Sequence, residues 1–420
     1  MKQIDLREYV TNDYQLTVDQ IDALLRESKV LHLAIEPDKG NKGRYNLTPG
    51  STVGALEFDG LSVLIKPKIG IPQLLSLACY AMGVYMPQDN PFDFQKADTL
   101  PDVLARNLVS AARRAFGRGL LRGYLTEEEA LHTVRGRIRF DEQIRRRYVI
   151  PLPVELRFDE FTEDIQANRL VKAAAARLGR MRLHSSEARR GLGWIAAILE
   201  NVSLLEFRRR VPEMRFDRLN EHYRHVVGLA RLILLHSEFE SFRGDARASG
   251  FLVDMNVLFQ EFVTQALRET LGVSERTLRA DKGVDEIALD KEGEVQVFPD
   301  LTLWDGRNCM FVGDAKYKDL TDKKARNADL YQLLAYATAL DLPGGLLIYA
   351  QGAPGETTYQ VKNAGKLLMV AALDLSQSIE DILSRVSDIA DMVKDLRDKA
   401  LPAKTTATAS SPMPRQITVS

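Results

Sequence analysis

The sequence contains few of the residues that build disulfide-linked, zinc-clustered or membrane-spanning proteins. Its 420 residues include only two cysteines, Cys79 and Cys309, which excludes a disulfide scaffold and a thiolate zinc cluster and indicates a reducing compartment. The six histidines lack metal-ligand spacing. No run reaches the roughly 18 uncharged apolar residues that cross a bilayer, and the N-terminus lacks the apolar core of a secretory signal. We therefore expect a soluble, cytoplasmic protein that does not contact a membrane.

An overall excess of one charge is also absent. The chain carries 57 Lys and Arg against 58 Asp and Glu, which excludes a histone-like polycation. The distribution is uneven, because residues 101–250 hold 28 basic and 20 acidic side chains. This surplus favours contact with a polyanion such as DNA, and Arg135, Arg137 and Arg139 are the candidate phosphate contacts. The alternative is a set of solvated arginine-rich helix faces.

Pattern changes along the chain predict an α+β multidomain protein. Residues 1–100 are β-rich, and residues 101–245 are helical and basic. Residues 246–400 alternate helices with strands, as α/β domains do. Residues 401–420, rich in Thr, Ser, Ala and Pro, are predicted to be a disordered tail.

Local signals place several elements within these regions. Asp59-Gly60, between two apolar segments, predicts a hairpin turn. The spacing of apolar residues predicts helices over 251–272 and 323–340. Apolar, β-branched segments predict strands over 295–304 and 308–317. A strand pair followed by a helix is the arrangement that places polar strand ends at one edge of a sheet.

Residues 36–50 are too polar for a core and are predicted to form an exposed loop. Lys39, Lys42 and Arg44 stand among glycines there. This basic loop is our candidate for a finger that contacts a protein partner. The alternative is a surface loop without a partner.

The segment FPDLTLWDGRNCMFVGDAKYK carries the clearest chemical signal. Asp300 follows Pro299 on one predicted strand, and Asp314-Ala315-Lys316 ends the next. A hairpin brings both strand ends to one edge, with Asp314 and Lys316 on the same face. Two carboxylates and the Ala315 carbonyl are hard oxygen donors of the kind Mg²⁺ prefers. A lysine beside them stabilises the charge that develops during phosphodiester hydrolysis.

The alternative is structural, because Asp after Pro is common in turns and D-x-K also forms surface ion pairs. Two apolar strands that end abruptly in charge favour the catalytic interpretation. Glu261, in the preceding helix, offers a further carboxylate. Gln332 and Tyr336 share a face of the following helix, where an amide and a phenol would hold the lysine or the DNA backbone. Without such a role they belong to an ordinary amphipathic helix.

P-D, D-x-K and Q-x-x-x-Y in this order resemble the PD-(D/E)xK nucleases in their RecB-like form. More specifically, the chain resembles McrC, the nuclease subunit of the McrBC modification-dependent restriction systems. The resemblance spans roughly residues 1–380. It rests on PDLTL, VGDAKYK and DLYQLLAYA, with TVRGRI (133–138), FDEFTEDIQANRLVKAA (158–174) and LSVLIKPKIG (61–70).

The resemblance implies a restriction-endonuclease-like C-terminal domain. It also implies Asp300 and Asp314 as Mg²⁺ ligands and Lys316 as the catalytic lysine. The sequence departs from the family in the preceding helix, where L-F-E is usual. Here Gln260 follows Phe259 and Glu261 comes one position later, which turns the side chain by about 100°.

The family further implies a partner, the hexameric AAA+ GTPase McrB, whose GTP hydrolysis the N-terminal part stimulates. The chain has no G-x-x-x-x-G-K-[ST] motif, so the GTP is expected to bind the partner. The expected function is that of a type IV restriction endonuclease subunit, which cleaves double-stranded 5-methylcytosine DNA with Mg²⁺ in defence against foreign DNA. Two alternatives remain: a RecB-like repair exonuclease, and a non-catalytic adaptor of an AAA+ motor.

Overall fold

The chain forms two compact units, each made of several stretches of sequence. The first comprises residues 1–5, 54–64 and 84–252, and the second comprises residues 6–53, 65–83 and 253–420. The computed structural model describes residues 2–38, 40–41, 43–83, 99–147, 152–205, 211–212, 214–237, 249–280, 287–319, 323–351 and 357–408.

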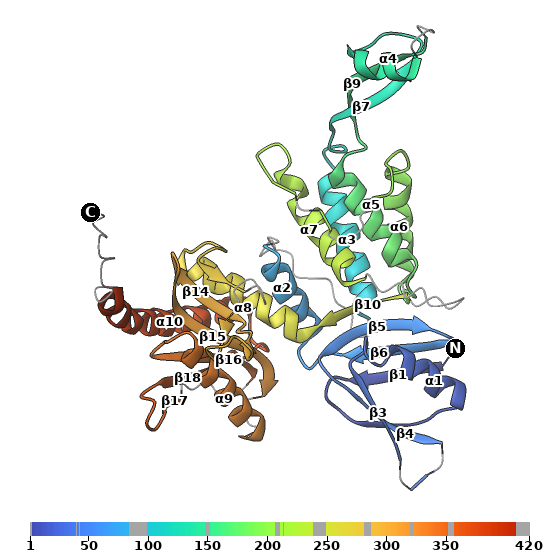
Figure 1. Ribbon diagram of the computed structural model, residues 1–420. Helices are drawn as coiled ribbons and strands as arrows, with labels where there is room; N and C mark the ends of the chain where they lie inside the picture. Colours follow the sequence, from blue (N-terminus) through green and yellow to red (C-terminus); the bar gives the residue numbers. More distant parts are fainter. Residues whose placement is uncertain are drawn as a thin grey trace, which may run out of the picture. The chain divides into compact units, whose positions relative to one another are not determined.

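Four helices of the first unit pack as a bundle (Figure 1). In the helix Gln166–Gly179 the buried positions recur at three- and four-residue spacing, whereas the helix Leu100–Phe116 is buried along most of its length. Tyr223, at the end of a short 3-10 helix (η1, Glu221–Tyr223), is fully buried and accepts the backbone N–H of Leu121 at 2.9 Å. The bundle helices are α3 (Leu100–Phe116), α5 (Gln166–Gly179), α6 (Ser186–Ile198) and α7 (Arg224–His236).

The expectation of a helical middle region is wrong for part of its length. Strands β7 (Gly123–Leu131), β9 (Val154–Thr162) and β8 (Arg137–Ile138) form a sheet in that order, and α4 (Phe140–Arg147) follows β8. Glutamate favours helices, yet β7 pairs with β9 along all nine of its residues. The pairing sets glutamates of β7 opposite β9, including Glu128 opposite Arg157, and such cross-strand pairs outweigh local propensity.

The N-terminal region is β-rich, as predicted. Its hairpin turn has positive φ at Asp59 (46°) and Gly60 (76°), which suits Asp-Gly. One sheet has the order β1 (Lys2–Arg7), β6 (Leu61–Lys66), β5 (Thr52–Phe58) and β10 (Ser249–Asp254), and a second has the order β2 (Asn12–Gln15), β4 (Arg44–Pro49) and β3 (Leu33–Pro37). The helices here are α1 (Val18–Glu27) and α2 (Ile71–Ala81).

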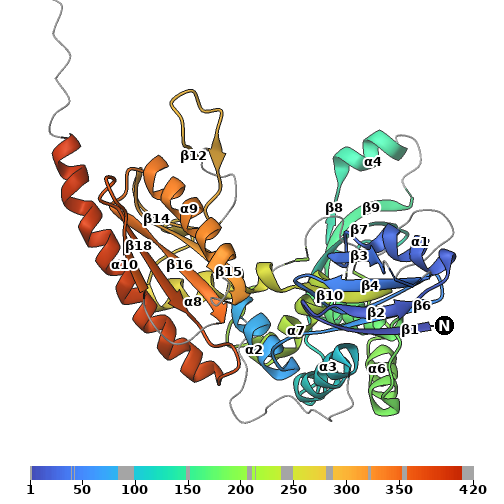
Figure 2. The same cartoon turned by 90° about the horizontal axis from the view of Figure 1, so that it is seen from below.

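The C-terminal region contains a mixed sheet, and α9 and α10 lie on opposite sides of it (Figure 2). Strands β15, β16 and β18 are parallel, whereas β14 and β17 run antiparallel to their neighbours. The order is β11 (Leu278–Arg279), β14 (Leu301–Asp305), β15 (Asn308–Asp319), β16 (Gly344–Gln351), β18 (Leu367–Ala372) and β17 (Thr357–Gln360). The helices are α8 (Met255–Leu271), α9 (Lys323–Ala339) and α10 (Ile379–Thr408), and a small pair joins β12 (Ile287–Ala288) with β13 (Gln296–Val297).

Three expectations for this region need correction. The predicted strand 295–304 is interrupted between β13 and β14, because Pro299 has no N–H for a ladder. The predicted helix 251–272 starts only at α8, where Asp254 caps the N-terminus by accepting the Asn256 N–H. Of the predicted disordered tail, residues 401–408 continue α10, and residues 409–420 lie outside the described residues.

Within the described part of the chain, no helix is both long and apolar enough to span a membrane. Cys79 and Cys309 are both buried, and neither forms a disulfide bond.

Candidate active site

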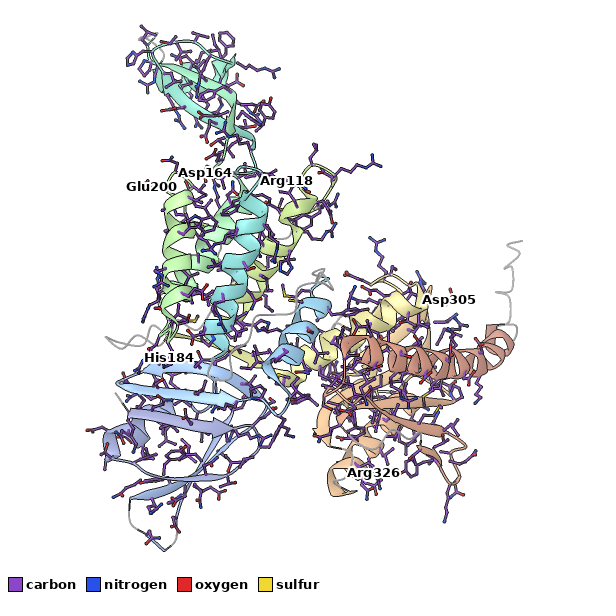
Figure 3. All side chains as sticks on the ribbon, turned by 180° about the vertical axis from the view of Figure 1, so that it is seen from behind. Arg118, Asp164, His184, Glu200, Asp305 and Arg326 are labelled. Carbon is purple, nitrogen blue, oxygen red and sulfur yellow. The ribbon has the colours of Figure 1, made fainter. Side chains whose placement is uncertain are left out.

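The β14–β15 hairpin brings Asp300 and Asp314 together. Leu301 pairs with Gly313, so the aspartates that flank this pair are adjacent at one end of the hairpin; Asp305, labelled in Figure 3, closes its other end. The Ala315 N–H donates to Asp300 Oδ2 at 3.2 Å, and the Asp300 N–H donates to Asp314 Oδ1 at 3.4 Å. Both side chains are buried, with 5% and 1% of their surface exposed. The backbone thus holds two carboxylates side by side away from water.

Lys316 completes the cluster. Its Nζ lies 2.5 Å from Asp314 Oδ2, on the face that alternation predicts. Burial, and after it the adjacent Asp300 carboxyl, raise the pKa of Asp314, while Lys316 opposes that shift. Burial alone would lower the pKa of Lys316, but the charges of Asp314, Asp300 and Asp329 raise it. The lysine is therefore held as an ammonium by surrounding carboxylates.

The Ala315 carbonyl faces the same edge. β14 ends its pairing at Leu301–Gly313, so no strand pairs with Ala315 on that side. The Ala315 N–H points to Asp300, and the N–H and C=O of one strand residue point to the same side. The carbonyl therefore lies on the side of the carboxylates, away from β16.

Gln332 and Tyr336 share a helix face, as their spacing predicts, but their contact differs from the expectation. Gln332 Nε2 donates to Tyr336 Oη at 2.5 Å, and the Tyr336 hydroxyl donates to the Phe298 carbonyl at 3.1 Å. Burial raises the pKa of Tyr336, and the charges of Asp314 and Asp300 raise it further. The pair thus fixes the backbone two residues before Asp300, rather than holding the lysine.

Glu261 is not brought into this cluster. Glu261 is an exposed residue of α8. The charges that act on Asp314 and Lys316 come from Asp300, Asp329 and from one another. Gln260, which stands where the family has glutamate, donates to the Ala280 carbonyl at 3.4 Å. The one-residue shift of the glutamate thus leaves Glu261 exposed on α8, while Gln260 contacts the Ala280 carbonyl.

Sequence reasoning missed Asp329 and Tyr349. Asp329 lies on α9, the helix in which Figure 3 labels Arg326, and its carboxylate accepts the Tyr349 hydroxyl at 2.8 Å. The signal was present in the sequence, since Asp329 precedes Gln332 by three residues and Tyr336 by seven, which is one helix face.

Within the described residues, no group of three or more His, Cys, Asp and Glu side chains is arranged to hold a metal ion. The cluster therefore supplies two side-chain carboxylates, and any third protein oxygen comes from the backbone. This is fewer ligands than a metal cage built only of protein groups requires.

The candidate DNA-binding arginines lie in the first unit, in and beside the β7–β9–β8 sheet. The Arg135 guanidinium is 3.5 Å from the Phe158 ring centroid and 3.6 Å from Glu160. Arg139 lies 2.9 Å from Glu128 and also pairs with Glu142. Arg137 is exposed on β8. Two of the three guanidiniums thus already have acidic neighbours.

The candidate partner-binding residues are described only in part. Lys39 and Lys42 lie outside the described residues. Arg44 belongs to β4 rather than to a loop, and its Nη2 is 2.5 Å from Asp13 Oδ2. The exposed loop predicted over 36–50 is thus mostly the hairpin of β3 and β4.

The family model for McrBC 5-methylcytosine restriction system components matches residues 47–350. The chain belongs to this family. The chain is 25% identical over 309 residues to the type IV methyl-directed restriction enzyme EcoKMcrBC of Escherichia coli K12, and the match covers 68% of this chain and 86% of that protein. The resemblance to an McrBC component is thereby confirmed.

A solved structure shares the fold. It is a half-complex from a tetradecameric assembly of Thermococcus gammatolerans McrB AAA+ hexamers with bound McrC. The superposition has a TM-score of 0.60 at 20% identity and covers 92% of this chain and 99% of the other. This McrBC component therefore shares its multidomain fold of helices and sheets with a chain of that assembly.

Proposed function

We propose that this McrBC component is the DNA endonuclease subunit of a GTP-driven, modification-dependent restriction complex. The observation that carries the proposal is the pair of buried carboxylates, Asp300 and Asp314, with the half-buried Lys316 beside them on paired strands, in a chain of this family. Two carboxylates and an ammonium side by side are costly to bury, so a cluster of this kind points to use in chemistry. The E. coli relative is a methyl-directed restriction enzyme, which favours methylated DNA as the substrate.

The donor set fits Mg²⁺. Burial raises the pKa of Asp314, and the adjacent Asp300 carboxyl raises it further. A divalent cation would relieve the repulsion between the two carboxylates when both are ionised. Together with the Ala315 carbonyl they offer three oxygens, which suits an ion that keeps several waters and takes the rest from phosphate. A bound Mg²⁺ would stabilise the negative charge that develops on the scissile phosphate.

The remaining side chains have separate roles. The Lys316 ammonium orients the attacking water and neutralises charge on the phosphate. Tyr336, through the Phe298 carbonyl, fixes the backbone that carries Asp300, while Gln332 fixes Tyr336. These contacts position the reacting groups, and cleavage slows when such groups move by more than a few tenths of an ångström.

DNA contact outside the site is assigned to the basic first unit. Arg137, exposed on β8, is the leading candidate for a phosphate contact. Arg135 and Arg139 can contact phosphate only by breaking their ion pairs with glutamates. Their contribution to affinity is expected to be smaller.

The partner is proposed to be an McrB-like AAA+ GTPase hexamer, because the archaeal neighbour binds such hexamers. GTP would bind the partner, since this chain has no P-loop motif. Lys39, Lys42 and Arg44 are proposed to stimulate its GTPase activity. Lys42→Ala combined with Arg44→Ala is expected to lower partner GTP turnover without loss of folding; unchanged turnover in the folded double variant would refute the assignment.

A cleavage assay tests the function against its alternatives. Circular and linear DNA, methylated and unmethylated, is incubated with Mg²⁺, with and without GTP and the McrB-like GTPase of the same genome. Partner- and GTP-dependent cutting of methylated circles supports the proposal. Partner-independent degradation from ends favours a repair exonuclease, and stimulated GTPase activity without cutting favours an adaptor.

A further inference from the structure

Asp329 is a buried carboxylate with no part in the cluster described by the nuclease motif. Only 4% of its surface is exposed. It lies one turn before Gln332 on α9, on the face that also carries Tyr336. An aspartate in such a place costs free energy unless its charge is compensated, and an apolar side chain would pack there without that cost.

Two neighbouring strands compensate this charge. The Tyr349 hydroxyl of β16 donates to Asp329 Oδ2 at 2.8 Å, and Lys318 Nζ of β15 lies 3.2 Å from Oδ1. The β15–β16 register shifts between Lys316 and Asp319, so spacing alone does not place Lys318. Its ion pair with Asp329 places Lys318 on the α9 side of the sheet. Asp329 therefore stands above β15 and β16 on the face that carries the catalytic cluster.

The parallel register places this group beside the proposed catalytic lysine. Lys316 pairs with Tyr349 across β15 and β16, so the two side chains are neighbours on one face. The charge of Asp329 also acts on the Lys316 ammonium. Lys316 is thus in contact with a carboxylate of its own strand, Asp314, and is acted on by the charge of a carboxylate of the covering helix, Asp329.

We propose that Asp329, held by Tyr349, is a positioning residue for Lys316 in DNA cleavage; this inference rests on the proposed nuclease function. Lysine has a long flexible stem, and Asp314 alone would draw the ammonium onto itself. In this structure the ammonium rests on Asp314. A fixed second anion on α9 opposes that attraction, so that the ammonium can move to the phosphate when DNA binds. Tyr349 aims the carboxylate through a hydrogen bond to its Oδ2.

The test compares Asp329→Asn and Tyr349→Phe with the wild type, each in complex with the GTPase partner, on methylated plasmid. Asp329→Asn removes the charge and keeps the shape, while Tyr349→Phe removes one oxygen. We expect kcat to fall about 10- to 100-fold in Asp329→Asn and by roughly 3- to 10-fold in Tyr349→Phe, with KM for DNA within about twofold. Tyr331→Phe, an exposed tyrosine of the same helix, is the matched control and is expected to cut at the wild-type rate.

Wild-type kcat in both Asp329→Asn and Tyr349→Phe would overturn the inference. So would a fall in kcat matched by an equal rise in KM, or by an equal loss of partner GTPase stimulation, because a merely structural role produces those losses together. If Asp329→Asn does not fold, Tyr349→Phe decides alone, since the carboxylate stays in place. Failure of the wild-type complex to cut would overturn the proposed function and this inference with it, whereas an active wild type with normal variants overturns the inference only.

Discussion

Two charged regions of this molecule use their charges differently. In the β7–β9–β8 sheet with α4, arginines are numerous and exposed, and several pair with glutamates, as Arg139 does with Glu128. At the β14–β15 hairpin only a few charges gather, yet Asp300 and Asp314 are buried and their like charges are held together by backbone hydrogen bonds. Exposed ion pairs contribute little free energy, whereas buried ones are costly to assemble. Burial, rather than the number of charges, therefore distinguishes the candidate active site.

The largest expected effect comes from Asp300→Asn, which removes one of the two like charges and preserves the acceptor for the Ala315 N–H. Cleavage is expected to fall by about 10³-fold or more, because a metal ligand is lost. The free energy of unfolding at pH 7.5 is expected to rise by roughly 1 kcal/mol, because Asp314 no longer faces a second carboxylate. Plasmid cleavage and denaturant unfolding measure the two quantities.

The matched control is Asp388→Asn, in an exposed pair with Arg385 on α10. It should leave both cleavage and stability close to wild type. Equal effects of Asp300→Asn and Asp388→Asn on cleavage and stability would show that burial does not distinguish the candidate active site.

Tyr336→Phe is expected to have an intermediate effect. It removes the hydrogen bond to the Phe298 carbonyl and so loosens the segment that carries Asp300. The cleavage rate should fall about tenfold, and the free energy of unfolding by about 1 kcal/mol. Single-turnover cleavage and thermal unfolding measure these effects. Wild-type cleavage by the variant would show that the Gln332–Tyr336 pair only packs α9.

Glu8 is another buried carboxylate, and its burial makes the free energy of unfolding depend on pH. It is fully buried, it accepts the Lys68 N–H at 3.1 Å and the Tyr317 hydroxyl at 3.2 Å, and burial raises its pKa from 4.5 to about 7. A carboxyl that binds its proton more tightly when folded stabilises the protein most at low pH, and this contribution is lost as pH rises from about 4.5 through about 7.

Glu8→Gln should therefore remove part of the pH dependence. Between pH 5 and pH 8, the wild type is expected to lose about 1–3 kcal/mol of unfolding free energy relative to the variant. Denaturant unfolding at the two pH values measures the difference. Glu128→Gln, an exposed glutamate paired with Arg139, should differ from wild type equally at both. Parallel pH profiles of Glu8→Gln and wild type would contradict the account.

The smallest effects are expected among the arginines in and beside the β7–β9–β8 sheet. Arg137→Ala should weaken DNA binding and reduce the slope of log affinity against log salt by about 1, as the loss of one phosphate contact does. Arg139→Ala should change the slope less, because this guanidinium already pairs with Glu128 and Glu142. Salt-dependent binding measurements compare the two. A larger change for Arg139 than for Arg137 would show that ion pairing does not limit phosphate contact.

Much of the fold could be predicted from local patterns. The Asp59-Gly60 turn, the bundle helices and the β14–β15 pair all follow from propensity and periodicity, which act over short distances. β7 could not be predicted in this way. Its glutamate-rich segment becomes a strand only because β9, more than twenty residues later, pairs with it. Long-range pairing of that kind leaves little local signal.

The candidate site was predicted in the same uneven manner. Asp300, Asp314 and Lys316 follow from strand ends and alternation, which the sequence contains. The role of Tyr336 does not, because its partner is a backbone carbonyl, and every residue has one. Asp329 lies on the helix face of Gln332 and Tyr336, and the spacing in the sequence shows that much. Its contacts with Tyr349 and Lys318 could not be predicted, because these residues come from two different strands. Contacts that only the assembled sheet creates cannot be predicted from spacing along the chain.

The most direct test of the central claim is plasmid cleavage by the complete complex with Mg²⁺ and GTP, comparing the wild type with Asp314→Ala. The account predicts that the wild type linearises methylated plasmid. It also predicts that Asp314→Ala does not cut, while it still binds the partner and stimulates GTP hydrolysis. Cutting that survives Asp314→Ala would contradict the account, because the nuclease site would then lie elsewhere.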